Sequence, residues 1–252
     1  MKILGFIPAR SGSKGVKNKN IKEIKGVPLI EFSVFSAIKS MEKGYLTDVL
    51  LSTDSNHYLN LVSQYKITKD YIRPKELATD KSPTIDSVIH ALNWYKSEKN
   101  KSFDAVMILQ PTSPFRTPEH ILEAINLLKK NKSCTCVTSI QRLGDHHPMR
   151  IKIFEENGRL IDYCSHSKEP EPSRRQDFKP NAYIRNGAIY LTRTKTIIEQ
   201  KLIRGDYVVG FEMPEANSIN VDEHFDFLTA SAAINYEYFQ NNLSFFSKLI
   251  NK

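Results

Sequence analysis

The chain has 252 residues, of which 40% are hydrophobic and 25% are charged, and it contains 10 Gly and 12 Pro. This composition excludes a collagen-like, low-complexity or intrinsically disordered chain, and the length suits one large domain or a main domain with an elaboration. Lys and Arg number 36 against 28 Asp and Glu, a formal net charge of +8 that would suit a nucleic acid, an anionic surface or a small anionic ligand.

The sequence gives no sign of an export signal or a membrane span. The apolar stretch at 3–9 ends at Arg10, and no run approaches the roughly 20 apolar residues of a spanning helix. The three cysteines, Cys134, Cys136 and Cys164, are odd in number and lack the spacing of metal ligands. We therefore expect a protein of the reducing cytoplasm without membrane contact.

Hydrophobic periodicity predicts alternating strands and helices along the first 140 residues. Strands are expected at 3–8, 49–52, 105–109 and 135–140, and helices at 28–39, 58–64, 82–95 and 118–130. The run at 105–109 is apolar on both faces, which is typical of the middle of a parallel sheet. The alternation predicts an α/β fold with a doubly wound, mainly parallel sheet.

The alternation stops at about residue 141. The segment 141–182 is polar, Pro-rich and weakly periodic, whereas regular structure resumes at 186–191 and 207–212 and closes with a helix at 223–239. Ordinary connections run about 4–6 residues, so an excursion of this length is more than a loop. We predict an α/β domain formed by 1–140 and 183–252, with an inserted dimerisation arm or lid at 141–182.

The segment 8–20 follows the first predicted strand and combines Gly and small hydroxyl residues with four cations. Small residues let backbone N–H groups approach phosphate oxygens, and the cations neutralise them. The spacing is neither that of Walker A nor that of the dinucleotide fingerprint, and a solvated basic turn is the alternative. The segment 10–25 contains six cations and one carboxylate, so the positive charge of the chain is concentrated here. It is not distributed over the whole chain, as binding of a polyanion would require.

Five blocks in order resemble the CMP-sialic acid synthetases (N-acylneuraminate cytidylyltransferases). They are IPARSGSKG at 7–15 with KNKN at 17–20, LSTD at 51–54, RPKELA at 73–78, LQPTSPFR at 109–116 and NGAIY at 186–190. The resemblance covers nearly the whole chain. It implies a Rossmann-like nucleotidyltransferase in which the anomeric hydroxyl of a nine-carbon α-keto-acid sugar attacks the α-phosphate of CTP, giving a CMP-sugar and pyrophosphate with the help of Mg²⁺.

The same resemblance implies a nucleotide site. The residues carried over by motif are Arg10, Ser11, Gly12, Ser13, Lys14, Gly15, Lys19, Asn20, Arg73 and Thr84. Among them Arg10 and Lys19 are expected to act in catalysis together with Asp222. Two carry alternatives: Arg73 could be a surface arginine at a strand end, and Thr84 could simply cap a helix.

A sugar site and a metal site follow from the resemblance as well. The residues expected to bind the sugar are Gln110, Arg174, Arg175, Asn186 and Tyr190. For Mg²⁺ the family pattern has two aspartates separated by one residue, and this chain has Asn220 and Asp222 there. Asp222 fits the metal and Asn220 is a weaker partner, with Asp222 as a helix N-cap the alternative.

A second departure concerns the carboxylate of the acid. Many sialic acid members have an Arg two places before the Asn of NGAIY, and this chain has Ile184 there. The neighbouring Arg185 is expected on the opposite face of an extended segment. Related nonulosonic acids, such as legionaminic acid, are therefore alternative substrates to N-acetylneuraminic acid.

The arm at 141–182 implies a homodimer in the family. The sequence His146-His147-Pro148 is followed two residues later by Arg150, which we expect to contact the triphosphate in the partner's site. Transfer to the eight-carbon acid Kdo is the alternative within the enzymes. Two further alternatives are not active enzymes: a nucleic-acid-binding module and a catalytically weakened nucleotide sensor. A nucleic-acid-binding module would call for a basic stripe with stacking aromatic residues, and the sequence shows none.

Overall fold

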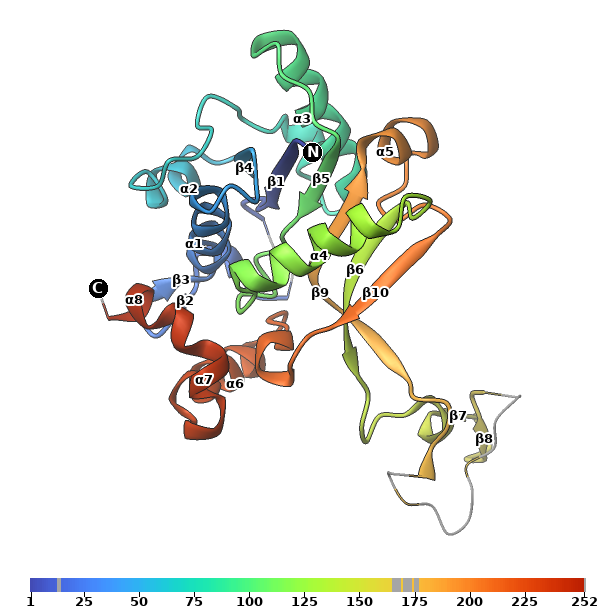
Figure 1. The fold of residues 1–252 in the computed structure, drawn as a ribbon. Coiled ribbons are helices and arrows are strands. Elements are labelled where there is room, and N and C mark those ends of the chain that lie inside the picture. Colours follow the sequence, from blue (N-terminus) through green and yellow to red (C-terminus); the bar gives the residue numbers. More distant parts are fainter. Residues whose placement is uncertain (13–14, 165–168, 170–173, 175–176, 252) are drawn as a thin grey trace.

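The centre of the molecule is a six-stranded sheet with helices on both faces (Figure 1). The computed structural model describes residues 1–12, 15–164, 169, 174 and 177–251. The strands lie in the order β10 (Val208–Glu212), β6 (Cys136–Arg142), β9 (Tyr183–Arg193), β5 (Ala105–Ile108), β1 (Ile3–Pro8) and β4 (Asp48–Ser52). β9 runs antiparallel to β5 and β6, and the other pairs are parallel. The predicted doubly wound, mainly parallel α/β fold is confirmed.

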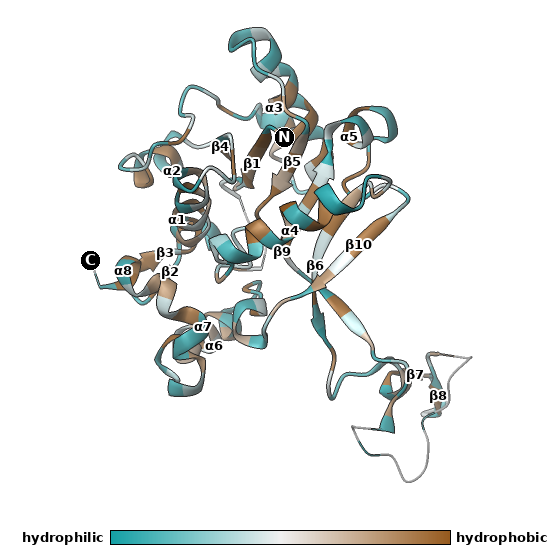
Figure 2. Cartoon of the chain, viewed as in Figure 1, coloured by the Kyte–Doolittle hydropathy of each residue, from teal (hydrophilic) through white to brown (hydrophobic). Residues whose placement is uncertain are grey.

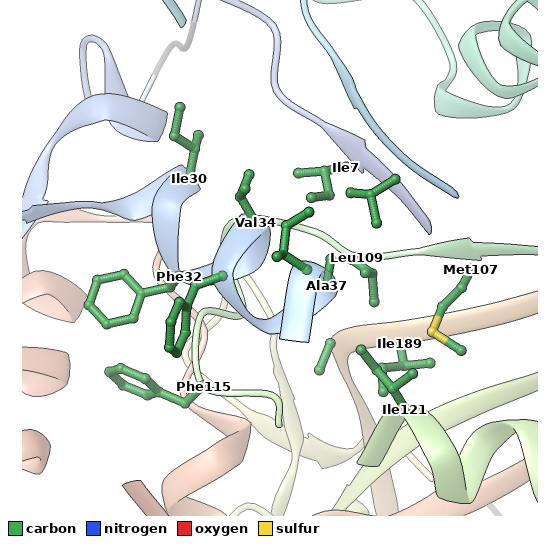
Figure 3. Close-up of a cluster of buried hydrophobic side chains, with 14 of the residues drawn as sticks. Ile7, Ile30, Phe32, Val34, Ala37, Met107, Leu109, Phe115, Ile121 and Ile189 are labelled. Carbon is green, nitrogen blue, oxygen red and sulfur yellow. The ribbon is translucent and has the colours of Figure 1, made fainter. Parts of the chain in front are cut away.

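Alternate residues of the central strands face the two layers of helices, as a strand period of two requires. One layer contains α1 (Leu29–Glu42), α4 (Pro118–Lys130) and α6 (His224–Asn235). The other contains α3 (Thr84–Glu98) and α5 (Thr194–Gln200). In the first layer, Figure 3 shows Val34 and Ala37 of α1 near Ile7 and Leu109 from the sheet. Both faces of the central strands are therefore buried.

Short elements complete the main body. They are β2 (Glu23–Ile24), β3 (Val27–Pro28), α2 (Asn56–Leu61), α7 (Gln240–Leu243) and α8 (Ser247–Ile250). The predicted closing helix ends early, because Tyr236 is extended (φ −79°, ψ 117°) and a 3-10 turn at Glu237–Phe239 follows. Phe246, beyond it, is fully buried and packs on Phe32 and Phe115. Figure 2 shows the brown, apolar strands covered by helices with teal outer faces.

Beyond the sheet, β6 and β9 lead to a small two-stranded element that stands apart from the main body (Figure 1). β7 (Lys152–Phe154) and β8 (Leu160–Asp162) pair antiparallel there, and Phe154 and Leu160 are exposed. The division into an α/β domain and a dimerisation arm stays a prediction. In the described part of the chain, no helix combines the length and the apolar character needed to cross a membrane.

The start of α4 contains a partly buried histidine, His120, that makes folding sensitive to acid. Thr117 donates its backbone N–H to Nδ1 of His120 (3.1 Å), and burial lowers the pKa of His120 to about 4. In the unfolded chain His120 takes up a proton below its usual pKa of about 6.5, whereas the folded chain resists protonation. The contribution of His120 to the free energy of unfolding is therefore fully present above about pH 6.5 and is lost as the pH falls toward 4.

We expect the titration of His120 to lower the free energy of unfolding by up to about 3 kcal/mol between pH 7 and pH 4.5. Urea denaturation of the protein and of His120→Gln at both pH values measures it. The Gln side chain can still accept from Thr117 but does not titrate, so the variant should lose less stability with acid. An identical loss in the two proteins would contradict this role of His120.

Candidate active site

The loop that follows β1 is anchored on the loop that follows β4. Ser11 donates its backbone N–H (2.8 Å) and its hydroxyl (2.7 Å) to the carboxylate of Asp54, and Tyr58 donates its hydroxyl to the carbonyl of Ser11 (3.2 Å). Burial acts to raise the pKa of Asp54, but the hydrogen bonds from Ser11 outweigh it and hold the pKa below its usual value. The Asp54 carboxylate thus fixes the start of the predicted phosphate loop. Ser13 and Lys14 of this loop lie outside the described residues.

Two arginines lie near this anchor. Arg73 is 5% exposed and donates from Nε to the hydroxyl (2.9 Å) and from Nη2 to the carbonyl (2.7 Å) of Ser52. Burial lowers the pKa of Arg73, and the nearby charge of Arg10 adds to this effect. Arg10 itself forms an ion pair with Asp80 (2.5 Å). The alternative of a surface arginine at position 73 is therefore wrong, whereas contact with the base stays a prediction.

The end of the phosphate loop turns back toward the segment that follows β10. Asn18 takes a left-handed conformation (φ 55°) and opens a 3-10 turn at Lys19–Ile21. Lys19 then forms an ion pair with Asp222 (2.6 Å). Asn20 donates its side-chain amide to the carbonyl of Arg10 (3.0 Å), which closes the loop on itself. Two of the three residues predicted to act in catalysis, Lys19 and Asp222, are thus in contact.

The N-cap of α6 is Glu223 and not Asp222. Glu223 and Asp226 form a capping box, in which Asp226 accepts the backbone N–H of Glu223 (2.7 Å). The carboxylate of Asp222 is 52% exposed and contacts Lys19 and the side-chain amide of Asn220. The helix-cap alternative for Asp222 is therefore wrong, and its carboxylate is left for contacts outside the helix.

These oxygens form a possible site for a hard cation. No group of three or more His, Cys, Asp or Glu able to hold a metal occurs among the described residues. Mg²⁺ commonly takes one or two carboxylates and completes its shell with substrate phosphates and water. The carboxylate of Asp222 and the amide oxygen of Asn220 fit an ion that is shared with a phosphate ligand, and do not fit a cage made by protein alone.

A rigid turn after β5 places Gln110. It is fixed by Arg116, which is fully buried and donates to the carbonyls of Ala188 (2.7 Å), Ser113 (2.6 Å) and Gln110 and to the hydroxyl of Ser33 (2.8 Å). Burial lowers the pKa of Arg116 to about 9, which leaves it charged at neutral pH. The hydrogen bonds of this guanidinium therefore connect the turn with α1 and β9.

The start of β9 lies against this turn. The side chain of Asn186 accepts from Ser139 (2.6 Å) and donates to Ser218 (2.8 Å), and its contact with a sugar stays a prediction. Gly187 has φ +73°, and a Cβ there would lie 2.8 Å from Oε1 of Gln110. Only glycine suits this position, because the left-handed backbone and the close side chain both disfavour a Cβ.

Two adjoining cavities open at this edge of the sheet. The larger, which we call the Asp222 cavity, has a volume of about 970 Å³, and its lining includes Gln110, Arg185, Tyr190, Asn220 and Asp222. The smaller, which we call the Thr84 cavity, has a volume of about 520 Å³, and its lining includes Thr84, Gln110, Arg185, Tyr190 and Leu202. Gln110, Arg185 and Tyr190 line both cavities and form their shared wall.

Arg150 and Arg174, two of the arm residues predicted to act in the site, form ion pairs with carboxylates of the arm. Arg150 forms ion pairs with Asp145 (2.7 Å) and Glu169 (3.4 Å). Arg174 is 69% exposed and pairs with Asp177 (2.8 Å), which raises the pKa of Arg174. Arg175 lies outside the described residues. The roles predicted for these three arginines stay predictions.

One cavity residue differs from the expectation. Arg185 was expected on the face away from the sugar site, but it lines both cavities. The prediction for Arg185 assumed regular alternation along β9. Gly187 within that strand was the available signal, since glycine in a strand often marks a bulge.

The sequence of this chain is similar to the sequences of known proteins. The chain matches the family described as Cytidylyltransferase over residues 4–206. It is 32% identical over 233 residues to an N-acylneuraminate cytidylyltransferase of Escherichia coli, covering 90% of this chain and 50% of that protein. It is 34% identical over 205 residues to a CMP-N,N'-diacetyllegionaminic acid synthase of Legionella pneumophila, covering 80% of this chain and 82% of that protein. The chain thus spans about half the length of the first relative.

The fold is also found among solved structures. A CMP:2-keto-3-deoxy-manno-octonic acid synthetase complexed with CTP aligns with a TM-score of 0.64 and 17% identity, covering 93% of this chain and 99% of that one. At this identity the likeness concerns the fold alone.

Proposed function

The chain belongs to the cytidylyltransferase family, and we propose that it transfers the cytidylyl group of CTP to a nonulosonic acid with release of pyrophosphate. The observation that carries the proposal is the contact between Lys19 and Asp222 beside a cavity that Gln110 also lines. This arrangement offers a cation for phosphate, a carboxylate for a hard cation and an amide for a hydroxyl. Two sequence relatives are named for such acids, which supports the substrate class.

The reaction requires positioning and charge neutralisation more than covalent catalysis. The anomeric oxygen of the acid forms a bond to the α-phosphorus of CTP, the bond between the α-phosphorus and the bridging oxygen to the β-phosphate breaks, and the hydroxyl proton is lost to a base or to water. Lys19 stabilises the charge that develops on the phosphates. Gln110, on the shared wall, binds the attacking hydroxyl or its neighbours.

The nucleotide lies over the loop that follows β1. We assign its phosphates to Arg10, Lys19, Ser13, Lys14 and the backbone around Ser11, Gly12 and Gly15, and its nucleoside to Asn20 and Arg73. Thr84 lines the Thr84 cavity and would reach the nucleotide from the side of the acid. Gly12 and Gly15 have no side chain to keep a ligand away, so backbone N–H groups of this loop can approach phosphate oxygens directly.

Asp222 and Asn220 are the residues that we propose to hold Mg²⁺. The ion would supply a positive charge for the phosphate oxygens and the leaving pyrophosphate. Because Asn220 is neutral, it adds an oxygen ligand without a second negative charge. Its amide also contacts the carboxylate of Asp222, which helps to orient that ligand.

The acid occupies the shared wall and extends into the Thr84 cavity. Ile85, Leu202 and Ile203 give this cavity an apolar part, whereas Lys201 and Arg204 give it positive charge. Such a lining suits an anionic sugar that carries apolar groups such as N-acyl methyls. Asn186 and Tyr190 of β9 line the Asp222 cavity beside this wall, and Arg174 and Arg175 remain candidates from the arm.

Assembly and location are part of the same proposal. We propose a homodimer through 141–182, with Arg150 reaching the triphosphate in the partner's site. The exposed apolar residues Phe154 and Leu160 on the arm support a protein contact there. The three cysteines are free, which suits the reducing cytoplasm.

Pyrophosphate release from CTP and Mg²⁺ tests the proposal directly. N-Acetylneuraminic acid, N,N'-diacetyllegionaminic acid and Kdo are supplied one at a time, and the CMP-sugar is identified by mass. We expect turnover with at least one of the two nonulosonic acids and none, or far less, with Kdo. Turnover with Kdo alone would establish the eight-carbon alternative, and the absence of turnover with every acid would refute the enzyme.

A second prediction concerns Lys19. Lys19→Ala should lower kcat by at least about 100-fold, because a cation that stabilises a transferring phosphate group is lost. Lys132→Ala, which removes one exposed charge just before the amino end of β6, is the matched control and should keep normal turnover. A Lys19→Ala protein with near-normal kcat would show that Lys19 is only a partner of Asp222.

A third prediction concerns the cation. Asp222→Asn should abolish Mg²⁺-dependent turnover without loss of folding, because it removes the carboxylate while keeping the shape of the side chain. Asn220→Asp restores the second carboxylate of the family pattern and should tighten Mg²⁺ binding, measured by titration of turnover and by calorimetry in the presence of CTP. Unchanged Mg²⁺ dependence in both variants would place the ion elsewhere.

A further inference from the structure

Arg185 is a cation of the shared wall that has no role in the arrangement described so far. It is exposed, and within the described residues its guanidinium has no hydrogen bond or ion pair. It lines the Asp222 cavity and the Thr84 cavity together with Gln110 and Tyr190. Arg185 therefore stands where the two proposed substrates meet.

An irregularity in β9 brings Arg185 to this wall. Along β6, Thr138 lies opposite Tyr190 and Ile140 lies opposite Arg185, and the register shifts between these pairs. Thr138 and Ile140 are two residues apart and face the same side of the sheet, so their partners face that side too. Arg185 and Tyr190 thus share a face although they are five residues apart. Gly187, with φ +73°, lies within the irregular stretch.

The charges around the two cavities favour an anion at this wall. The Thr84 cavity has Lys201 and Arg204 besides Arg185, and no carboxylate occurs among the described residues that line it. The carboxylates of the Asp222 cavity are Glu215, Asp222 and Asp226, which all come from the segment after β10. A negatively charged group is therefore repelled from that segment and attracted toward β9.

The chemistry of the acid indicates which negatively charged group would lie at this wall. In the ring form of an α-keto-acid sugar, the carboxylate and the anomeric hydroxyl are attached to the same carbon. The cation that binds the carboxylate consequently stands beside the reacting oxygen, on the wall that both cavities share. Lys201 and Arg204 line the Thr84 cavity but not the Asp222 cavity, and Arg174 is paired with Asp177 on the arm.

We propose that Arg185 binds the carboxylate of the acid substrate and so directs the anomeric hydroxyl toward the α-phosphate. The assignment rests on the proposed function. A guanidinium offers two parallel N–H donors to a carboxylate, which fixes the direction of the ligand as well as its charge. Arg185 would thereby bind the carboxylate that the apolar side chain of Ile184 cannot bind.

The test compares each acid with its carboxamide in Arg185→Gln. Loss of a charged hydrogen-bonded pair should raise KM for the acid about 10- to 100-fold and leave KM for CTP within about twofold. The protein should prefer the acid over the amide by a similar factor, and Arg185→Gln should abolish that preference. Arg185→Lys should restore part of it, because the charge returns without the fork.

Two matched variants separate the possible explanations. Lys132→Gln removes an equal charge outside the cavities and should keep the preference for the acid. Loss of the preference in Lys201→Gln, with its retention in Arg185→Gln, would place the carboxylate deep in the Thr84 cavity and overturn the assignment. An active protein whose Arg185→Gln variant keeps the preference refutes only the role of Arg185, whereas inactivity of the unaltered protein with every acid refutes the proposed function as well.

Discussion

The buried guanidinium of Arg116 determines how the site edge of the sheet is built. A charge that is fully removed from water is costly unless its donors are all satisfied. Each of the three nitrogens of Arg116 donates a hydrogen bond, to the turn after β5, to Ser33 of α1 or to Ala188 of β9. Pro111 and Pro114 restrict the turn, so its carbonyls can face inward. One side chain thus holds three elements together and leaves the side chain of Gln110 at the shared wall.

On the phosphate side, two of the cations form ion pairs with carboxylates. Arg10 pairs with Asp80, and Lys19 pairs with Asp222. Partly exposed ion pairs contribute only about 0–1 kcal/mol, so exchanging a carboxylate for a phosphate costs little. The pairs keep the long side chains close to their working positions before CTP binds. On the proposed function, the turn of Lys19 toward a phosphate releases Asp222 for a hard cation.

Much of the fold could be predicted from sequence, because β1, β4, β5 and β6 and the helices between them have strong periodicity. The antiparallel direction of β9 could not, since it depends on pairing with strands distant in sequence. The N-cap of α6 was also ambiguous, because Asp222 and Glu223 are adjacent acids and only the reciprocal capping box between Glu223 and Asp226 decides between them. The side on which Arg185 lies depends on a register shift, and periodicity alone cannot reveal such a shift.

The two departures from the family pattern have a common physical consequence. Asn220 donates its amide to Asp222 and accepts from the hydroxyl of Ser113 (3.3 Å), whereas an aspartate at 220 would repel the neighbouring carboxylate. The neutral amide therefore helps to hold Asp222 in place and leaves less negative charge on that wall. Arg185, which lines the same cavity, then meets fewer competing carboxylates and remains available to an acidic ligand. The wall at Asn220 and Asp222 and the wall at Arg185 are thus suited to ligands of opposite charge.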